Sequence, residues 1–116
     1  MNRIFSLVAL AATLTISTSA FAGGDIEAGK KKSLACQACH GADGNAGTDA
    51  QYPRLAGQYH DYLEQALREY KNGKRKNVIM GGFAKPLSED DILDVSAYFA
   101  SLPGKVEDLH GHLQGQ

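Results

Sequence analysis

The sequence predicts an all-α fold, with three main helices and two long loops between them. Apolar residues recur at the three- and four-residue spacing of amphipathic helices, and strand-like alternation of apolar and polar residues is scarce. Residues 41–57 and 74–87 instead hold closely spaced glycines and prolines, which are typical of irregular chain. Two loops of this length in a compact domain indicate that the chain wraps around something.

The first helix is predicted from about residue 25 to residue 34. Asp25 is a good N-cap, because its short carboxylate can accept hydrogen bonds from the first unpaired backbone N–H groups. Gly29 inside a helix costs about 1 kcal/mol relative to alanine, which makes sense where another helix crosses closely. Tyr98 is the candidate neighbour for that approach. The positions expected to face the interior are Ile26, Gly29 and Leu34.

The second helix is predicted from about residue 58 to residue 72. Gly73 is a good stop, since glycine readily adopts the left-handed conformation that ends many helices. Apolar and aromatic side chains recur along this helix at three- and four-residue spacing, which predicts one inward-facing side. They are Tyr59, Tyr62, Leu63, Ala66, Leu67 and Tyr70.

The last helix has the clearest boundaries in the sequence and begins after the N-cap Ser88. Acidic residues at positions 89–91 crowd its first turn, where the helix dipole favours negative charge. Pro103 and Gly104 end it. A single apolar stripe runs along it, formed by Ile92, Val95, Phe99 and Leu102.

Residues 1–22 have the organisation of a secretory signal peptide. Arg3 precedes an apolar run of about 13 residues, and Ala-Phe-Ala at residues 20–22 forms a small-x-small cleavage site. The alternative is a retained N-terminal anchor, but the run is too short to cross about 30 Å of hydrocarbon as a helix. We therefore expect a periplasmic domain of residues 23–116, with no membrane span after cleavage. Its tail, from about residue 105, has no clear period and is expected to be loosely held.

The 94 residues that remain after cleavage suffice for one domain and carry 11 basic and 13 acidic side chains. Because there is no basic excess, nucleic acid is not expected as a partner. A domain of this size buries a modest core and often depends on a staple, such as a disulfide, a metal or a covalent cofactor.

The chemistry is concentrated at Cys36, Cys39 and His40, which form the Cys-x-x-Cys-His pattern of haem c attachment. On a helical turn this spacing puts both sulfurs on one side, where each can form a thioether with one vinyl group of haem. The imidazole of His40 then points to the iron from the same face. A disulfide, a thioredoxin-like pair and a zinc site are the alternatives. However, the sequence lacks the βαβ context of a thioredoxin-like pair and a second ligand pair for zinc.

Met80 is the candidate for the second axial position of the iron. It is the only methionine after residue 22, and it lies in the second glycine-rich loop, forty residues after His40. The alternative interpretation of an isolated methionine is a core filler. Three histidines compete for the same role, but one begins a helix and two lie in the tail, so all are expected at the surface. They are His60, His110 and His112.

Together these motifs resemble those of the class I cytochromes c, over nearly all of residues 23–116. The nearest likeness is to one half of the two-haem bacterial cytochromes c4, whose halves share the run Pro-Arg-Leu-Ala-Gly-Gln. This chain differs in having a single haem motif. The matching segments are residues 24–29, 36–41, 43–45, 52–58, 80–88 and 97–100.

The resemblance implies a cytochrome c fold wrapped around one covalently attached haem c, with the first and last helices crossing at Gly29. It assigns Met80 as the distal iron ligand. It also implies that the carbonyl of Pro53 accepts a hydrogen bond from His40, with a simple turn proline as the alternative. Arg54 either approaches a haem propionate or is a solvated surface side chain.

The expected function is one-electron transfer between redox protein partners of the respiratory type. A histidine and a methionine fill both axial positions of the iron, so no position is left for a substrate and no enzymatic activity is expected. The soft methionine sulfur and apolar surroundings predict a relatively high potential. The alternatives are a ligand-binding sensor or weak peroxidase, and a permanently docked subunit. Lys71, Lys74, Arg75 and Lys76 form a basic cluster that is hypothesised to steer docking, with a solvated face as the alternative.

Overall fold

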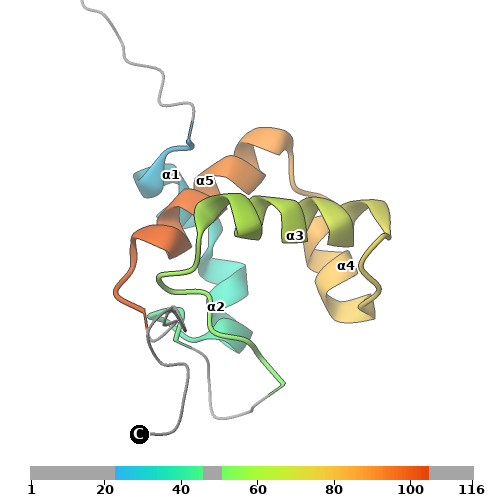
Figure 1. Ribbon diagram of the computed structural model, residues 1–116, viewed down its shortest axis with the longest axis horizontal. Coiled ribbons are helices and arrows are strands. Elements are labelled where there is room, and N and C mark those ends of the chain that lie inside the picture. The colour runs from blue at the N-terminus through green and yellow to red at the C-terminus, as the bar shows by residue number, and fades with distance from the viewer. Residues whose placement is uncertain (1–22, 46–50, 105–116) are drawn as a thin grey trace, which may run out of the picture.

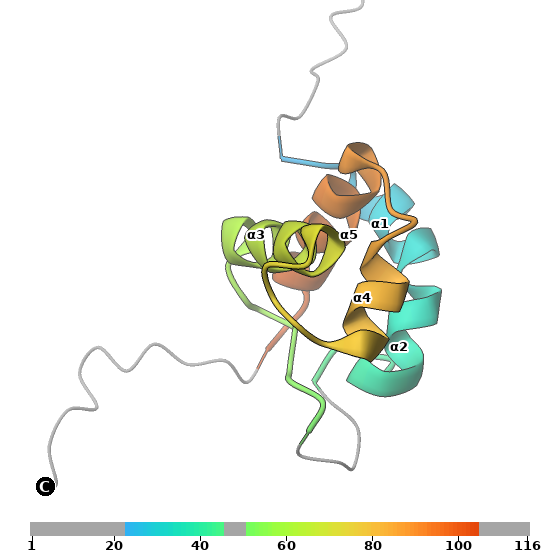
Figure 2. The same cartoon turned by 90° about the vertical axis from the view of Figure 1, so that its right-hand side faces the viewer.

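The computed structural model describes residues 23–45 and 51–104 and shows the predicted all-α fold. This part of the chain contains no β-strand, and none of its helices has the length and hydropathy needed to span a membrane. The predicted signal peptide and tail lie outside the described residues. The helices, coloured in chain order in Figures 1 and 2, are α1 (Ile26–Lys32), α2 (Leu34–His40), α3 (His60–Asn72), α4 (Val78–Ala84) and α5 (Glu89–Ser101).

The helices α1 and α5 pack against each other (Figure 1). They meet at Gly29. Gly29 is buried, and a Cβ atom at this position would lie 2.0 Å from the carbonyl oxygen of Asp94 and 2.9 Å from Cβ of Tyr98. Because a side chain of any size would collide with the α5 backbone, glycine is what allows the two helices to meet. The predicted crossing is confirmed, with Tyr98 as its neighbour.

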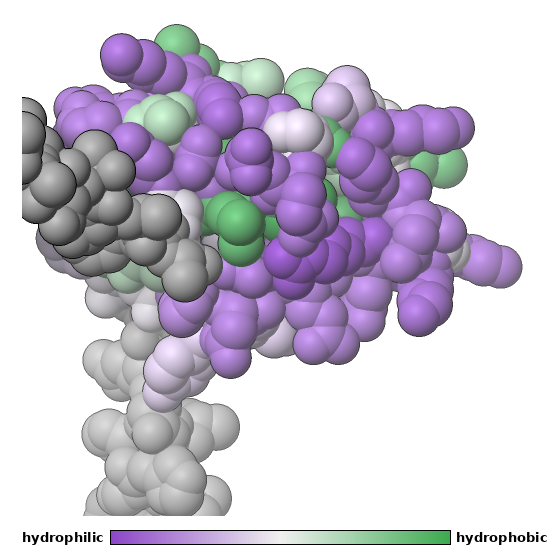
Figure 3. Space-filling view, turned by 90° about the horizontal axis from the view of Figure 1, so that it is seen from above, coloured by the Kyte–Doolittle hydropathy of each residue, from purple (hydrophilic) through white to green (hydrophobic). Residues whose placement is uncertain are grey.

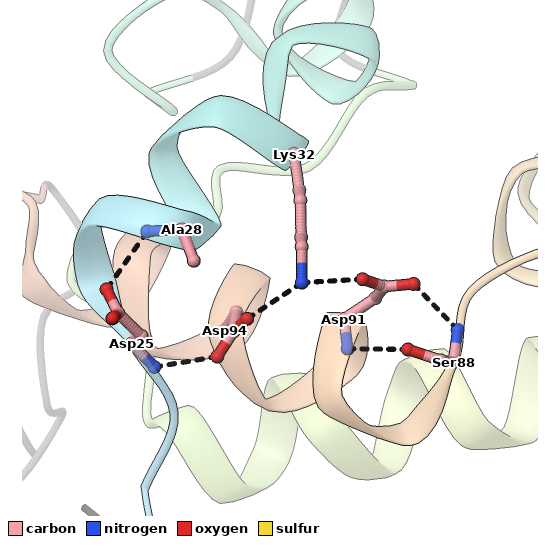
Figure 4. A network of polar contacts seen from close by, with 6 residues as sticks. All are labelled: Asp25, Ala28, Lys32, Ser88, Asp91 and Asp94. Atoms are coloured by element: carbon pink, nitrogen blue, oxygen red, sulfur yellow. Dashed lines mark hydrogen bonds and ion pairs between the residues drawn. The ribbon is translucent and has the colours of Figure 1, made fainter.

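A polar network also joins α1 to the first turns of α5 (Figure 4). The ammonium group of Lys32 lies 2.6 Å from Oδ1 of Asp91 and 2.8 Å from Oδ2 of Asp94. The backbone N–H of Asp25 donates to Oδ1 of Asp94 at 2.7 Å. Ser88 and Asp91 form a capping box, in which each side chain accepts a hydrogen bond from the backbone N–H of the other. Ion pairs and a hydrogen bond therefore hold both ends of α1 to the first turns of α5, and the capping box fixes the start of α5 itself.

This network predicts a loss of stability in acid. The Lys32 ammonium and the hydrogen bonds with Ser88 lower the pKa of Asp91 from 3.8 to about 2. Because the folded-state pKa lies below the unfolded one, this stabilisation is fully present above about pH 4 and is lost as the pH falls towards about 2. Lys32→Gln should therefore have a lower melting temperature than the parent protein at neutral pH. Its melting temperature should also depend less on pH across this window.

The matched control for that measurement is Lys31→Gln, because Lys31 is an exposed lysine on the same helix. It should keep the pH dependence of the parent protein. If Lys32→Gln and the parent gave the same midpoints from neutral pH down to the acid limit, the network would contribute nothing to stability.

The first predicted helix is divided at Ser33, which is fully buried and donates from its hydroxyl to the carbonyl of Lys30 at 2.9 Å. Gly29 and Ser33, one turn apart, form the inner face of this segment. The expectation that Ile26 and Leu34 face the interior is wrong, since they are 46% and 67% exposed. The close contact with α5 at Gly29 leaves room on this face for small residues only.

The hydrophobic core lies between α3 and α5. Val95 and Phe99 from the predicted stripe are buried there, and Leu63 of α3 packs with them. Gly73 ends α3 in the left-handed conformation, and Ser88 caps α5, as the sequence predicts. The face seen from above, where α1, α3 and α5 meet solvent, is mostly hydrophilic (Figure 3).

The second predicted loop, residues 74–87, is only partly irregular, because it contains α4. The side-chain oxygen of Asn77 caps this helix by accepting the backbone N–H of Met80 at 3.0 Å. A Cβ on Gly81 would lie 3.8 Å from the carbonyl oxygen of Tyr70 in α3, so the two helices are in contact here. Capping and tertiary packing outweigh the poor helix propensity of the two glycines in α4.

Candidate functional site

A cavity of about 440 Å³ is lined by α2, α3, α4 and residues 51–58. Figure 1 shows α2 and α4 below α3. Side chains of all three helices line the cavity. The volume falls within the range of small-molecule and cofactor sites. All the site residues predicted from the sequence line this one cavity: Cys36, Cys39, His40, Pro53 and Met80.

Cys36 and Cys39 lie three residues apart on α2, so both thiols reach the cavity from the same side. Burial raises the pKa of the Cys36 thiol, whereas redox-active cysteine pairs depend on a lowered pKa. In the described part of the chain, no group of three or more His, Cys, Asp or Glu side chains could hold a metal ion. The raised pKa of Cys36 does not fit a thioredoxin-like pair.

His40 lies at the end of α2 and is 5% exposed. It lies with Nδ1 2.8 Å from the carbonyl oxygen of Pro53. Because a carbonyl can only accept, Nδ1–H is the donor and Nε2 keeps its lone pair for a metal. The ring of Tyr52 lies edge-on to the imidazole, with 6.5 Å between the ring centroids. His40 is thus held in one orientation and one tautomer.

The segment that carries Pro53 is held beside the end of α2 by backbone hydrogen bonds. Gly41 ends α2 with a φ of 89° and donates its N–H to the carbonyl of Gln37. The carbonyl of Gly44 then accepts the N–H groups of Leu55 at 2.7 Å and Ala56 at 2.9 Å. The glycine-rich loop therefore returns to the helix that it left and brings the Pro53 carbonyl to His40.

Met80 is the third residue of α4, is half-buried and lines the cavity together with Phe83. His60 is exposed at the first position of α3 and is not part of the cavity lining. His110 and His112 lie outside the described residues. Of the four candidates for the second axial ligand, Met80 is the one that the described structure brings into the cavity with His40.

Two arginines also line the cavity. Arg54 donates from Nε to the carbonyl of Asn45 at 3.2 Å. The guanidinium carbon of Arg75 lies 5.8 Å from the ring centroid of Tyr62 and 5.3 Å from that of Tyr70. A cation over an aromatic ring contributes about 0.5–1 kcal/mol at an exposed site.

The surroundings of Arg75 differ from those that the sequence predicts. The sequence groups it with Lys74 and Lys76 as a solvated basic cluster, but its Nε lies 3.5 Å from a carboxylate oxygen of Glu69. Lys74 and Lys76 are exposed. The signal in the sequence is Gly73, a helix stop that turns the following residues back over α3. Asn77 was missed as well, although an asparagine three residues before Met80 is a good N-cap.

The cavity fits a haem group. An imidazole nitrogen and a thioether sulfur are suitable axial donors for iron, and two thiols three residues apart match the two vinyl groups. Arg54, which lines the cavity, is a suitable partner for a propionate. The walls are largely apolar, as a macrocycle requires, and include Leu55, Leu63, Ala66, Ile79 and Phe83.

The sequence pattern of the family described as cytochrome c matches residues 26–103. The chain belongs to the cytochrome c family. Membership implies covalently bound haem c with iron as the cofactor, in agreement with the chemistry of the cavity.

The chain is 45% identical to cytochrome c4 of Pseudomonas aeruginosa, across 87% of this chain and 49% of that protein. It is 36% identical to the thiosulfate dehydrogenase electron acceptor of Thiomonas intermedia, across 88% of this chain and 45% of that protein. Reduced recombinant cytochrome c4 from Pseudomonas stutzeri has a similar structure, with a TM-score of 0.66 and 42% identity over 72% of this chain and 48% of that one. The chain therefore spans about half the length of these relatives, and the predicted cytochrome c fold is confirmed.

Proposed function

We propose that the chain is a one-electron carrier whose single haem c is attached through Cys36 and Cys39. The haem supplies one reversible electron at its iron. The proposal rests on the cavity, which brings the two thiols, the imidazole of His40 and the thioether of Met80 together. The relative described as an electron acceptor supports the same function.

His40 and Met80 are the proposed axial ligands. The hydrogen bond from His40 to the Pro53 carbonyl orients the imidazole and makes its free nitrogen a better donor, which is the role we propose for Pro53. If both His40 and Met80 held the iron, the chain would leave no ligand position for a substrate. This supports a carrier rather than an enzyme.

The same residues support a relatively high reduction potential. The thioether of Met80 is a soft, weak donor and favours ferrous iron. The apolar walls around it, among them Leu63 and Phe83, disfavour the extra charge of the ferric state.

The proposed partners are redox proteins of the periplasm. The signal-peptide pattern of residues 1–22 supports export. The Thiomonas relative, named for accepting electrons from thiosulfate dehydrogenase, supports a dehydrogenase as one kind of donor. The exposed Lys74 and Lys76 are candidates for steering such a partner, whereas Arg75 is already engaged with α3.

Covalent attachment is tested by mass spectrometry of protein produced in a haem-competent periplasm. The mass after acid–acetone extraction should equal residues 23–116 plus one haem, because thioethers survive the extraction. The double variant Cys36→Ser/Cys39→Ser should lose the haem in the same step. A parent mass equal to the bare polypeptide, or to a polypeptide with a Cys36–Cys39 disulfide, would rule the proposal out.

A further inference from the structure

We propose that Arg75 is a positioning residue for Met80, which acts through the segment that joins α3 to α4. The inference rests on the proposed ligation of the iron by Met80 and extends it. How firmly Met80 holds the iron would then depend on the guanidinium of Arg75, which is not itself a ligand.

The first step is the anchoring of this segment to α3. Gly73 leaves α3 in the left-handed conformation, with a φ of 81°. The backbone N–H of Arg75 then donates to the carbonyl of Glu69 at 3.1 Å, and Nε of Arg75 lies 3.5 Å from the Glu69 carboxylate. Backbone and side chain of the same residue thus hold the segment to the last turn of α3.

The second step is the contact with two aromatic rings. The Arg75 guanidinium lies within 6 Å of the ring centroids of both Tyr62 and Tyr70. These rings are eight residues apart on α3, so the guanidinium bridges about two helical turns. Arginine suits this position because its planar, delocalised cation packs on aromatic faces, whereas a lysine ammonium is a compact point charge.

The third step links Arg75 to Met80. Two residues after Arg75, the side chain of Asn77 accepts the backbone N–H of Met80 at 3.0 Å. Val78, the first residue of α4, is 95% exposed, so apolar burial does not hold the start of this helix. The Asn77 cap and the Arg75 anchor fix this start, while the contact of Gly81 with α3 holds the next turn.

The cavity connects this anchor to function. Arg75, its two tyrosines, Asn77 and Met80 all line the same cavity. A displacement of Arg75 would therefore shift the Met80 sulfur within the cavity that it shares with His40. The expected effect is a weaker iron–sulfur bond in an otherwise folded protein.

The test is imidazole binding to the ferric holoprotein, followed by visible spectra. Imidazole must displace Met80, so its apparent affinity reports how firmly the sulfur is held. Arg75→Ala should bind imidazole about tenfold more tightly than the parent, which corresponds to about 1.4 kcal/mol. Its far-red sulfur-to-iron absorption should weaken and its reduction potential should fall. Arg75→Lys, which keeps the charge without the planar group, should bind imidazole with an intermediate affinity. If the alanine variant fails to take up haem, the affinity of Arg75→Lys tests the proposal instead.

Two further variants separate the possible outcomes. Lys74→Ala removes an exposed cation from the same segment and should bind imidazole like the parent. Met80→Ala has no sulfur to displace and should bind imidazole most tightly. If Met80→Ala binds tightly but both Arg75 variants match the parent, even with lower melting temperatures, Arg75 is only structural and the inference fails. If Met80→Ala itself matches the parent, the proposed ligation fails and the inference fails with it.

Discussion

Replacing Met80 with alanine should lower the reduction potential by on the order of 0.1 V or more, because axial-ligand identity spreads haem potentials over about 0.8 V. The soft sulfur that favours ferrous iron would be lost, and water or an added ligand would reach the iron. The weak far-red absorption of the ferric form should disappear. A redox titration followed by visible spectra measures all three effects on one sample.

The matched control for this experiment is Ile79→Ala. Ile79 precedes Met80 on α4 and also lines the cavity, so its loss removes apolar contact without removing a donor atom. It should keep the far-red absorption and shift the potential far less. An unchanged spectrum in Met80→Ala would instead move the ligand to a histidine, with His60→Ala as the next variant to measure.

Substituting the buried Gly29 with alanine should destabilise the protein more than the same change at an exposed helix position. The added Cβ would lie 2.0 Å from the carbonyl oxygen of Asp94, so α1 would have to move away from α5. Overpacking costs about 1–3 kcal/mol, and each kcal/mol lowers the melting temperature of a domain of this size by roughly 4–8 °C. Thermal unfolding of the holoprotein, followed by circular dichroism, should show a drop of this order.

The control here is Gly82→Ala in α4. No heavy atom lies within 4 Å of the position that its Cβ would occupy. Because alanine is the better helix former by up to about 1 kcal/mol, this variant should be neutral or slightly more stable. Equal melting temperatures for Gly29→Ala and the parent would contradict the close crossing of α1 and α5.

The sequence alone determined the parts of this protein that depend on neighbours along the chain. The spacing of Cys36, Cys39 and His40 sets their common side of a helical turn, whatever the rest of the chain does. The same holds for the capping box at Ser88 and the stop at Gly73, since caps are satisfied by groups three or four residues away. These local rules predicted the three main helices and the attachment pattern.

Only the tertiary structure decided which residues meet across long separations. Gly29 meets Asp94 through an approach of two backbones, and that approach explains why Ile26 and Leu34 face outwards. No local pattern sets the partner of Arg75, because its place over α3 depends on the path of the chain after Gly73.

Tertiary structure also decides that the segment carrying Met80 is a helix, α4. Its glycines predict irregular chain, but the Asn77 cap and the contact with α3 make it helical. Local propensities amount to a few tenths of a kcal/mol per residue, so contacts that form only on folding outweigh them. The sequence therefore predicts the donor atoms of the site, and the packing of α4 on α3 decides where the Met80 sulfur lies.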